Sequence, residues 1–182
     1  GPEGPTGATG PQGPAVTTGN LAINGDMEEF TGNIPTGWTG PGVNQSEKVT
    51  NAPYPSLVHS KASAVRLKET DPSIPVTLSR TTEIELKNCY YKCTFSTLCT
   101  GSTPELMVKL GFLDESDTLI GSYTEYSIGA GSLPPFDYGY RNFFFISDNK
   151  APETAAKVEV KFEATNLGNG QDIYIDDIFV YV

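Results

Sequence analysis

Glycine stands at every third position over the first fifteen residues, at Gly1, Gly4, Gly7, Gly10 and Gly13. The position after glycine is proline in four of these five triplets. In a collagen triple helix three polyproline-II strands wind around one axis, where only glycine fits. Proline fixes φ near the required value and so lowers the entropy lost on ordering. The repeat therefore predicts a triple-helical stem over residues 1–15 and a homotrimeric protein.

The rest of the chain has the composition of a folded domain. Glycine makes up 19 of 182 residues, well below the one third of a wholly collagenous chain. We expect a hinge at 16–20 and one domain over 21–182, because a segment of that length suits a single hydrophobic core. We also expect the natural stem to extend beyond the triplets of this sequence.

The charge of the chain argues against two classes of partner. The net charge is −10 at pH 7, and the lysines and arginines are scattered. Nucleic acid and anionic membrane surfaces are therefore not expected partners. No apolar run reaches the length of a membrane-spanning helix.

Alternation of apolar and polar residues dominates the domain. It is clearest at 157–165, where valine, phenylalanine and alanine alternate with lysine and glutamate, as in a strand that buries one face. Such segments, separated by turn residues, predict an all-β, antiparallel jelly-roll β-sandwich. The expected strands are Ala64–Lys68, Val76–Arg80, Cys89–Cys99, Leu106–Leu113, Leu119–Tyr126, Asn142–Ser147, Lys157–Thr165 and Ile173–Val182.

Three cysteines, Cys89, Cys93 and Cys99, fall within one predicted strand. At about 3.3 Å per residue the first two lie roughly 13 Å apart, beyond the reach of a disulfide, and the spacing fits no zinc motif. Two interpretations remain, namely buried free thiols or cross-links between chains. Strand parity places Tyr91 on the face of Cys89 and Cys93, opposite Tyr90, so we expect one of these tyrosines in the core.

The two ends of the domain resemble carbohydrate-binding modules of the galactose-binding jelly-roll type. Residues 24–28 read Asn-Gly-Asp-Met-Glu and residues 34–38 read Ile-Pro-Thr-Gly-Trp, where such modules have Asn-Gly-x-aromatic-Glu and then Pro-x-Gly-Trp. Residues 172–180 are similar to the last strand of these modules. Met27 departs from the usual phenylalanine, but both are large core side chains. The resemblance implies a jelly roll that binds sugars without catalysis.

Stem and domain together resemble collagen-like proteins of the bacterial spore surface. The stem contributes Gly-Pro-Thr-Gly-Ala-Thr, and the domain contributes Asn-Gly and Asp-Asp-Ile. This resemblance implies an extracellular protein of the exosporium of a spore-forming bacterium. It favours a non-catalytic structural and adhesive component of a surface filament, whose head domain caps and registers the trimer. The alternative is a carbohydrate-binding module that attaches the filament to surface or host glycans.

Carbohydrate-binding modules with these termini often hold a structural calcium ion between the first and last strands. The resemblance therefore implies a site at Glu28, Asp176 and Asp177, whose carboxylates are the hard oxygen ligands that calcium prefers. The alternative is that Asp176 and Asp177 end a solvated edge of the sheet.

A glycan site needs an aromatic platform beside polar side chains, because sugars stack their C–H faces on aromatic rings. Segment 133–141 gathers three aromatic residues and an arginine among prolines and a glycine. We expect it to form a recognition surface or a contact between protomers. The candidate ligand-binding residues are Trp38, Tyr54, Phe136, Tyr138, Tyr140 and Arg141. For each aromatic residue, core packing or a trimer contact is the competing interpretation.

No motif predicts catalysis. The sequence lacks Gly-x-Ser-x-Gly, a histidine beside a candidate nucleophile and a phosphate-binding glycine loop. We expect His59, the one histidine, to be a solvated loop side chain. Glu83 and Glu85 are two residues apart and are expected on a solvated strand face. We therefore predict that the protein is not an enzyme.

Overall fold

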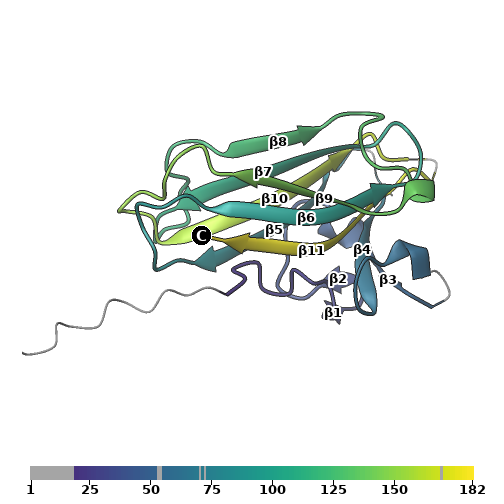
Figure 1. The fold of residues 1–182 in the computed structure, drawn as a ribbon, viewed down its shortest axis with the longest axis horizontal. Helices are drawn as coiled ribbons and strands as arrows, with labels where there is room; N and C mark the ends of the chain where they lie inside the picture. The colour runs from purple at the N-terminus through teal and green to yellow at the C-terminus, as the bar shows by residue number, and fades with distance from the viewer. Residues whose placement is uncertain (1–18, 53–54, 70, 72, 169) are drawn as a thin grey trace, which may run out of the picture.

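Two antiparallel β-sheets pack face to face in the computed structural model (Figure 1). The structure describes residues 19–52, 55–69, 71, 73–168 and 170–182. Within these ranges there is no α-helix, and no helix long and apolar enough to cross a membrane. The prediction of an all-β sandwich is confirmed for the domain, whereas the predicted collagen-like stem lies outside the described residues.

The two sheets contain four and five strands, and every pairing within them is antiparallel. The four-stranded sheet has the order β5 (Val76–Glu83), β10 (Lys157–Thr165), β7 (Glu105–Leu113), β8 (Thr124–Ile128). The five-stranded sheet has the order β3 (Ser46–Thr50), β4 (Ser63–Leu67), β11 (Ile173–Tyr181), β6 (Lys92–Cys99), β9 (Arg141–Ile146). The remaining elements are the hairpin β1 (Phe30–Thr31) and β2 (Ile34–Pro35) and the 3-10 turns η1 (Val43–Gln45), η2 (Pro55–Leu57) and η3 (Phe136–Tyr138).

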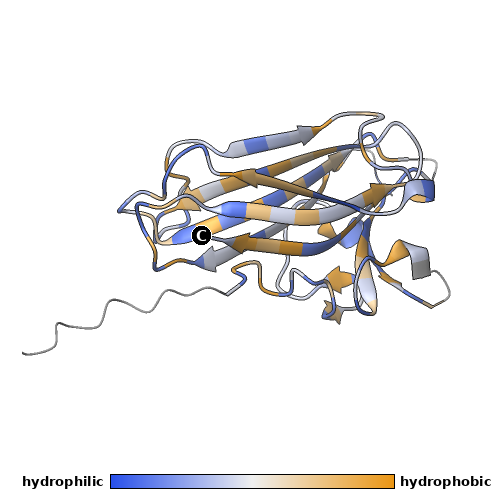
Figure 2. Ribbon diagram, in the orientation of Figure 1, coloured by the Kyte–Doolittle hydropathy of each residue, from blue (hydrophilic) through white to orange (hydrophobic). Residues whose placement is uncertain are grey.

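The alternation along β10 builds the centre of the core. Phe162 is completely buried, while its neighbours Lys161 and Glu163 are only partly covered. The Phe162 ring lies 5.3 Å from the Phe95 ring of the opposite sheet, in an edge-to-face arrangement. Figure 2 shows the same alternation of apolar and polar residues along several strands. The two-residue period thus places every second side chain between the sheets.

The eight predicted strands correspond to β4 to β11, but the position of β8 differs from the prediction. The strand predicted at 119–126 lies at Thr124–Ile128. Leu119 forms only an isolated bridge with Leu113, and the chain then turns at Gly121, whose φ is 76°. The sequence did not predict β3, because this polar edge strand has no apolar face.

The strand parity predicted around the cysteines is confirmed. Tyr91 is buried and its hydroxyl donates to the carbonyl of Leu86, whereas Tyr90 is exposed. All three cysteines are free, and Cys93 and Cys99 are buried as in the core-filling interpretation. Burial raises the pKa of the Cys93 thiol well above its usual range. Cross-linking between chains stays untested.

The first residues of the domain join the last strand through backbone contacts. The amide of Ile178 donates to the carbonyl of Gly25 at 2.8 Å. A Cβ at Gly25 would lie 2.0 Å from the carbonyl oxygen of Ile178, so only glycine fits at this position. Asn20, in the predicted hinge, accepts from the amide of Val180 and donates to the carbonyl of Ile178. Asn20 therefore packs against the domain through these hydrogen bonds.

The core makes a first prediction. Phe162→Ala should lower the free energy of unfolding by about 3–5 kcal/mol, because it leaves a cavity between the sheets. Urea unfolding followed by fluorescence measures this loss. The matched control is Phe144→Ala, which removes the same atoms from a side chain that is 61% exposed. Equal losses for the two variants would show that Phe162 does not occupy the centre of the core.

Candidate functional site

Exposed aromatic side chains gather on the outer face of the five-stranded sheet. Phe144 of β9 and Phe179 of β11 are 61% and 41% exposed, and Ile146 beside them is 51% exposed. The strands that carry them are apolar on both faces, with Phe143, Phe145 and Val180 directed into the sandwich. A two-layer sandwich buries only one face of each sheet, so the second set of apolar side chains is left in solvent.

The strand register turns two of these residues into facing walls. Phe179 pairs with Thr94 of β6, and Thr94 pairs with Phe144, so the two phenylalanines flank Thr94 on one face of the sheet. Neighbouring strands lie about 4.8 Å apart, which places the two wall residues roughly 10 Å from each other across β6. The groove between them has a volume of about 340 Å³. Its lining residues are His59, Lys92, Thr94, Phe95, Ser96, Asn142, Phe143, Phe144, Asp177 and Phe179.

An irregularity in β11 shapes one wall of the groove. The register with β6 shifts between Asp176 and Phe179, and Asp177 adopts a φ of 49°. Asp177 accepts a hydrogen bond from the hydroxyl of Ser60 at 2.6 Å and lies 2.6 Å from Nδ1 of His59. The bulge therefore directs Asp177 toward the loop that carries His59 and Ser60, and it keeps Phe179 on the groove side.

Asp176 also binds the loop that carries His59 and Ser60. Its side chain is completely buried, and one oxygen accepts the backbone amides of His59 and Ser60 at 3.1 and 3.0 Å. Burial is the largest influence on this carboxyl and raises its pKa to about 7, although the amide donors act in the opposite direction.

The calcium site expected from the resemblance does not find a matching donor set. Glu28 accepts the backbone amides of Ala62 and Ser63, and Asp176 and Asp177 accept donors from residues 59 and 60. Among the residues that the structure describes, no three or more His, Cys, Asp or Glu side chains are arranged to hold a metal ion. The three carboxylates thus fix the loop of residues 59–63, and calcium binding stays a prediction.

One end of the groove is closed by what we call the strap, defined as Leu57–Ser60 together with Tyr140. The Tyr140 hydroxyl donates to the carbonyl of Leu57 at 2.9 Å, and the rings of Tyr140 and His59 lie 5.2 Å apart. Burial raises the pKa of the Tyr140 hydroxyl well above its usual range, so it remains a proton donor. Leu57–Ser60 precede β4 and Tyr140 directly precedes β9, so the strap joins segments next to these two strands of the five-stranded sheet.

The structure distributes the sequence-predicted ligand residues over different environments. Trp38 is buried, with its ring 6.2 Å from that of Phe162, so it packs in the core and offers no surface platform. Tyr140 belongs to the strap. Phe136, Tyr138 and Arg141 are exposed but do not line the groove, and Tyr54 lies outside the described residues.

Sequence reasoning missed Phe144 and Phe179. The available signal was the apolar character of both faces in Asn-Phe-Phe-Phe-Ile and Ile-Phe-Val-Tyr-Val, because a sandwich strand needs only one apolar face. His59 is a loop residue as predicted, but its side chain is one third exposed and lies at the groove.

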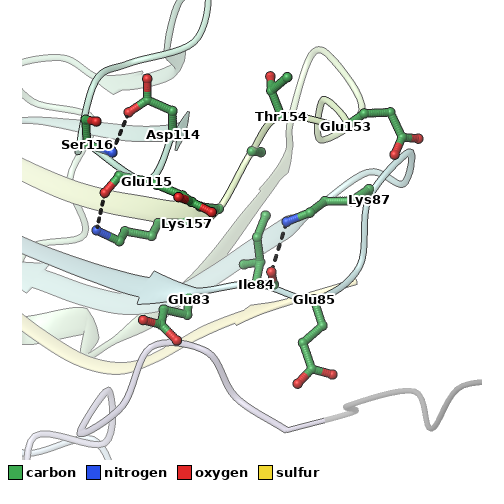
Figure 3. Close-up of a pocket in the computed structure, with 12 residues that line it drawn as sticks. Glu83, Ile84, Glu85, Lys87, Asp114, Glu115, Ser116, Glu153, Thr154 and Lys157 are labelled. Carbon is green, nitrogen blue, oxygen red and sulfur yellow. Dashed lines mark hydrogen bonds between the residues drawn. The ribbon is translucent and has the colours of Figure 1, made fainter.

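A larger hollow of about 870 Å³ lies near the end of β5 and the start of β10 (Figure 3). Acidic residues dominate its lining, including the exposed Glu83 and Glu85, as the sequence predicted for these two. Its two lysines are engaged, since Lys157 pairs with Asp117 and Lys87 donates to the carbonyl of Ile84. No aromatic side chain is among the described lining residues, so this hollow lacks a platform for a sugar ring.

Comparison with known proteins identifies the fold. No family model matches the chain, and no curated protein does. Among solved structures, a CBM61 module in complex with β-1,4-galactotriose has a TM-score of 0.64 at 14% identity, over 89% of this chain and 97% of that one. The fold is that of carbohydrate-binding modules. A CBM22-1 xylan-binding domain of Paenibacillus barcinonensis Xyn10C gives 0.51 at 13% identity, over 86% and 90% of the two chains.

A bacteriophage tailspike shares the same architecture. The match to the enzymatically active domain of bacteriophage CBA120 tailspike protein 4 has a TM-score of 0.63 at 15% identity. It covers 89% of this chain but only 21% of the tailspike chain. These similarities confirm the resemblance to carbohydrate-binding modules at the level of the fold. That the protein is not an enzyme stays a prediction.

The burial of Asp176 makes a second prediction. Its folded-state pKa is raised, so between about pH 4 and pH 7 the folded protein binds more protons than the unfolded chain. The free energy of unfolding should therefore fall as pH rises through this window, by up to about 4 kcal/mol from this group. Asp176→Asn removes this titration. The free energy of unfolding of the wild type minus that of the variant, measured by urea unfolding at each pH, should therefore fall as pH rises through this window.

The control for this measurement is Asp137→Asn, which removes the same charge at an exposed residue outside the strap. Its unfolding curves should run parallel to those of the wild type across the pH range. If Asp176→Asn also runs parallel to the wild type, Asp176 does not titrate in this window and burial does not raise its pKa to about 7.

Proposed function

We propose that this domain binds carbohydrate in the groove on the outer face of the five-stranded sheet. The observation that carries the proposal is the pair of exposed phenylalanines, Phe144 and Phe179, on either side of a polar floor. The apolar C–H face of a sugar ring stacks on such rings, and its hydroxyls seek polar partners between them.

The polar groups of the groove fit an uncharged, hydroxyl-rich ligand. The buried Ser96 hydroxyl donates to the amide oxygen of the exposed Asn142, which leaves the amide nitrogen of Asn142 to donate to a ligand. Thr94 adds a further hydroxyl on the floor. His59 and Asp177 stand at one end, and Lys92 stands at the other.

Two similar folds supply a starting point for ligands. The CBM61 module was solved with β-1,4-galactotriose, and the CBM22-1 domain is xylan-binding. We infer from this shared fold that β-linked plant-type polysaccharides are the first ligands to screen. The stem over residues 1–15 would present several copies of the groove on one trimer, so that weak single contacts add up by avidity. On this proposal the protein is an extracellular adhesive component, with the exosporium as its location.

The second candidate function is the structural cap of a trimeric filament, without a sugar ligand. It is favoured by one observation, the apolar surface formed by Phe144, Ile146 and Phe179, which would also suit a contact between protomers. Sedimentation of residues 19–182 separates the two. A monomer leaves the face free for glycan, whereas a trimer whose association is lost in Phe144→Ala supports the cap.

The third prediction tests the sugar site. Galactan and xylan are screened by affinity electrophoresis, and binding oligosaccharides are then titrated by calorimetry. Phe144→Ala and Phe179→Ala should each weaken the affinity about tenfold or more, which corresponds to a loss of about 1.4 kcal/mol of ring stacking. The stability of Phe144→Ala should change little, because this side chain is exposed.

The matched control is Tyr138→Ala, an aromatic residue that is 77% exposed and outside the groove. It should bind as the wild type does. Loss of binding in Tyr138→Ala with full binding in Phe144→Ala would move the recognition surface to segment 133–141 and overturn the groove.

A further inference from the structure

We infer that the groove receives the end of a glycan chain and excludes its interior. This inference rests on the proposed function and concerns the same groove. The inference follows from the position of the strap, because the groove that runs along β6 ends there.

The strap covers part of a sheet face that is otherwise open. Ser96 and Leu98 lie on the outer face of β6 together with Thr94, yet they are only 2% and 0% exposed. The partner of Leu98 on β11, Tyr174, is only 4% exposed. Tyr140 precedes Arg141, which pairs with Thr97, so the register places Tyr140 beside Leu98. A ligand that lies over Lys92 and Thr94 thus meets covered side chains from Ser96 onward, where the partner residue Asp176 holds the strap.

The strap is anchored as a wall. His59 and Ser60 are bound through their backbone amides to Asp176 and through their side chains to Asp177. Three of these four contacts involve a short distance of 3.0 Å or less. Tyr140 ties the other side through Leu57 and the ring of His59. Displacing the strap would break these bonds and expose a buried carboxyl, so sugar binding alone does not open it.

A second hollow lies on the far side of the strap. It has a volume of about 230 Å³ and is lined by residues of β3 and β4 together with Leu57 and Tyr174. Leu57 belongs to the strap, so the strap separates this hollow from the phenylalanine groove. Without the strap, the two hollows would form one cleft across the strands. Such an open cleft is what a site for the interior of a glycan chain requires.

The opposite end of the groove offers the exit. Lys92 lies there with its ammonium 4.8 Å from the ring centre of Phe144 and 5.6 Å from that of Tyr181. The exposed Ile146 pairs with Lys92 and continues this end of the surface onto β9. From Lys92 to Thr94 the uncovered floor along β6 measures about 7 Å, at about 3.3 Å per residue, which leaves room for a terminal sugar. The rest of the chain would leave past Lys92.

The fourth prediction is a stoichiometry. We would titrate full-length protein with β-1,4-galacto-oligosaccharides and xylo-oligosaccharides of two to six sugars, and with galactan and xylan of known length. If the groove recognises a chain end, each glycan chain should occupy one protein groove, whatever the length of the glycan. Blocking one end, by reduction of the reducing end or methylation of the other terminal sugar, should weaken the affinity at least tenfold for one of the two ends.

Three outcomes are distinguished. A number of bound grooves that rises with chain length, together with indifference to end blocking, overturns the inference and leaves the proposed function standing. No binding of any probe removes the proposed function and the inference with it. One groove per chain with sensitivity to one blocked end supports both.

A variant tests the strap directly. Tyr140→Ala removes the bond to Leu57 and the contact with His59, so it should join the two hollows and raise the number of grooves bound per polysaccharide chain. Tyr138→Ala, two residues away and outside the groove, should keep one groove per chain. A folded Tyr140→Ala that still binds only chain ends would contradict the strap as the stop. If this variant does not fold, the wild-type stoichiometry decides.

Discussion

The backbone contact between Gly25 and Ile178 is the constraint on which the rest of the structure depends. It joins the first turn of the domain to its last strand, and it leaves no room for a side chain at position 25. Ile178 lies within the irregular part of β11, where Asp177 has a positive φ and the register with β6 shifts. The same few residues therefore close the sandwich, direct Asp177 to the loop and place Phe179 beside the groove.

Carboxylates do much of the positioning at this end of the sheet. Glu28, Asp176 and Asp177 each accept donors from the loop of residues 59–63, and Lys61 pairs with Asp26. A loop that would otherwise be free is thereby held against the sheet from several sides. These are the carboxylates that the family resemblance implied as calcium ligands, and in the structure they accept backbone and hydroxyl donors of this loop. The price is the burial of Asp176, which makes the stability of the fold sensitive to pH.

The sequence carried most of the fold and little of the site. Strict alternation predicted β10, and Asn-Gly at 24–25 indicated the family resemblance, but no pattern predicted the contact of Gly25 with Ile178. The groove was not foreseen, because its walls come from Phe144 and Phe179, which only the register across β6 makes neighbours. The pairing of His59 with Asp177 spans 118 residues, so no local pattern reveals it. A polar edge strand such as β3 likewise has no periodic signature.

The docking of Asn20 along β11 has a mechanical consequence. Asn20 and Leu21 are bound to Ile178 and Val180, the two residues on either side of Phe179. Tension applied at Asn20 and Leu21 is therefore borne first by the strand that forms a wall of the groove. A force on the start of the domain and a force on a bound ligand would therefore act on the same short segment of β11.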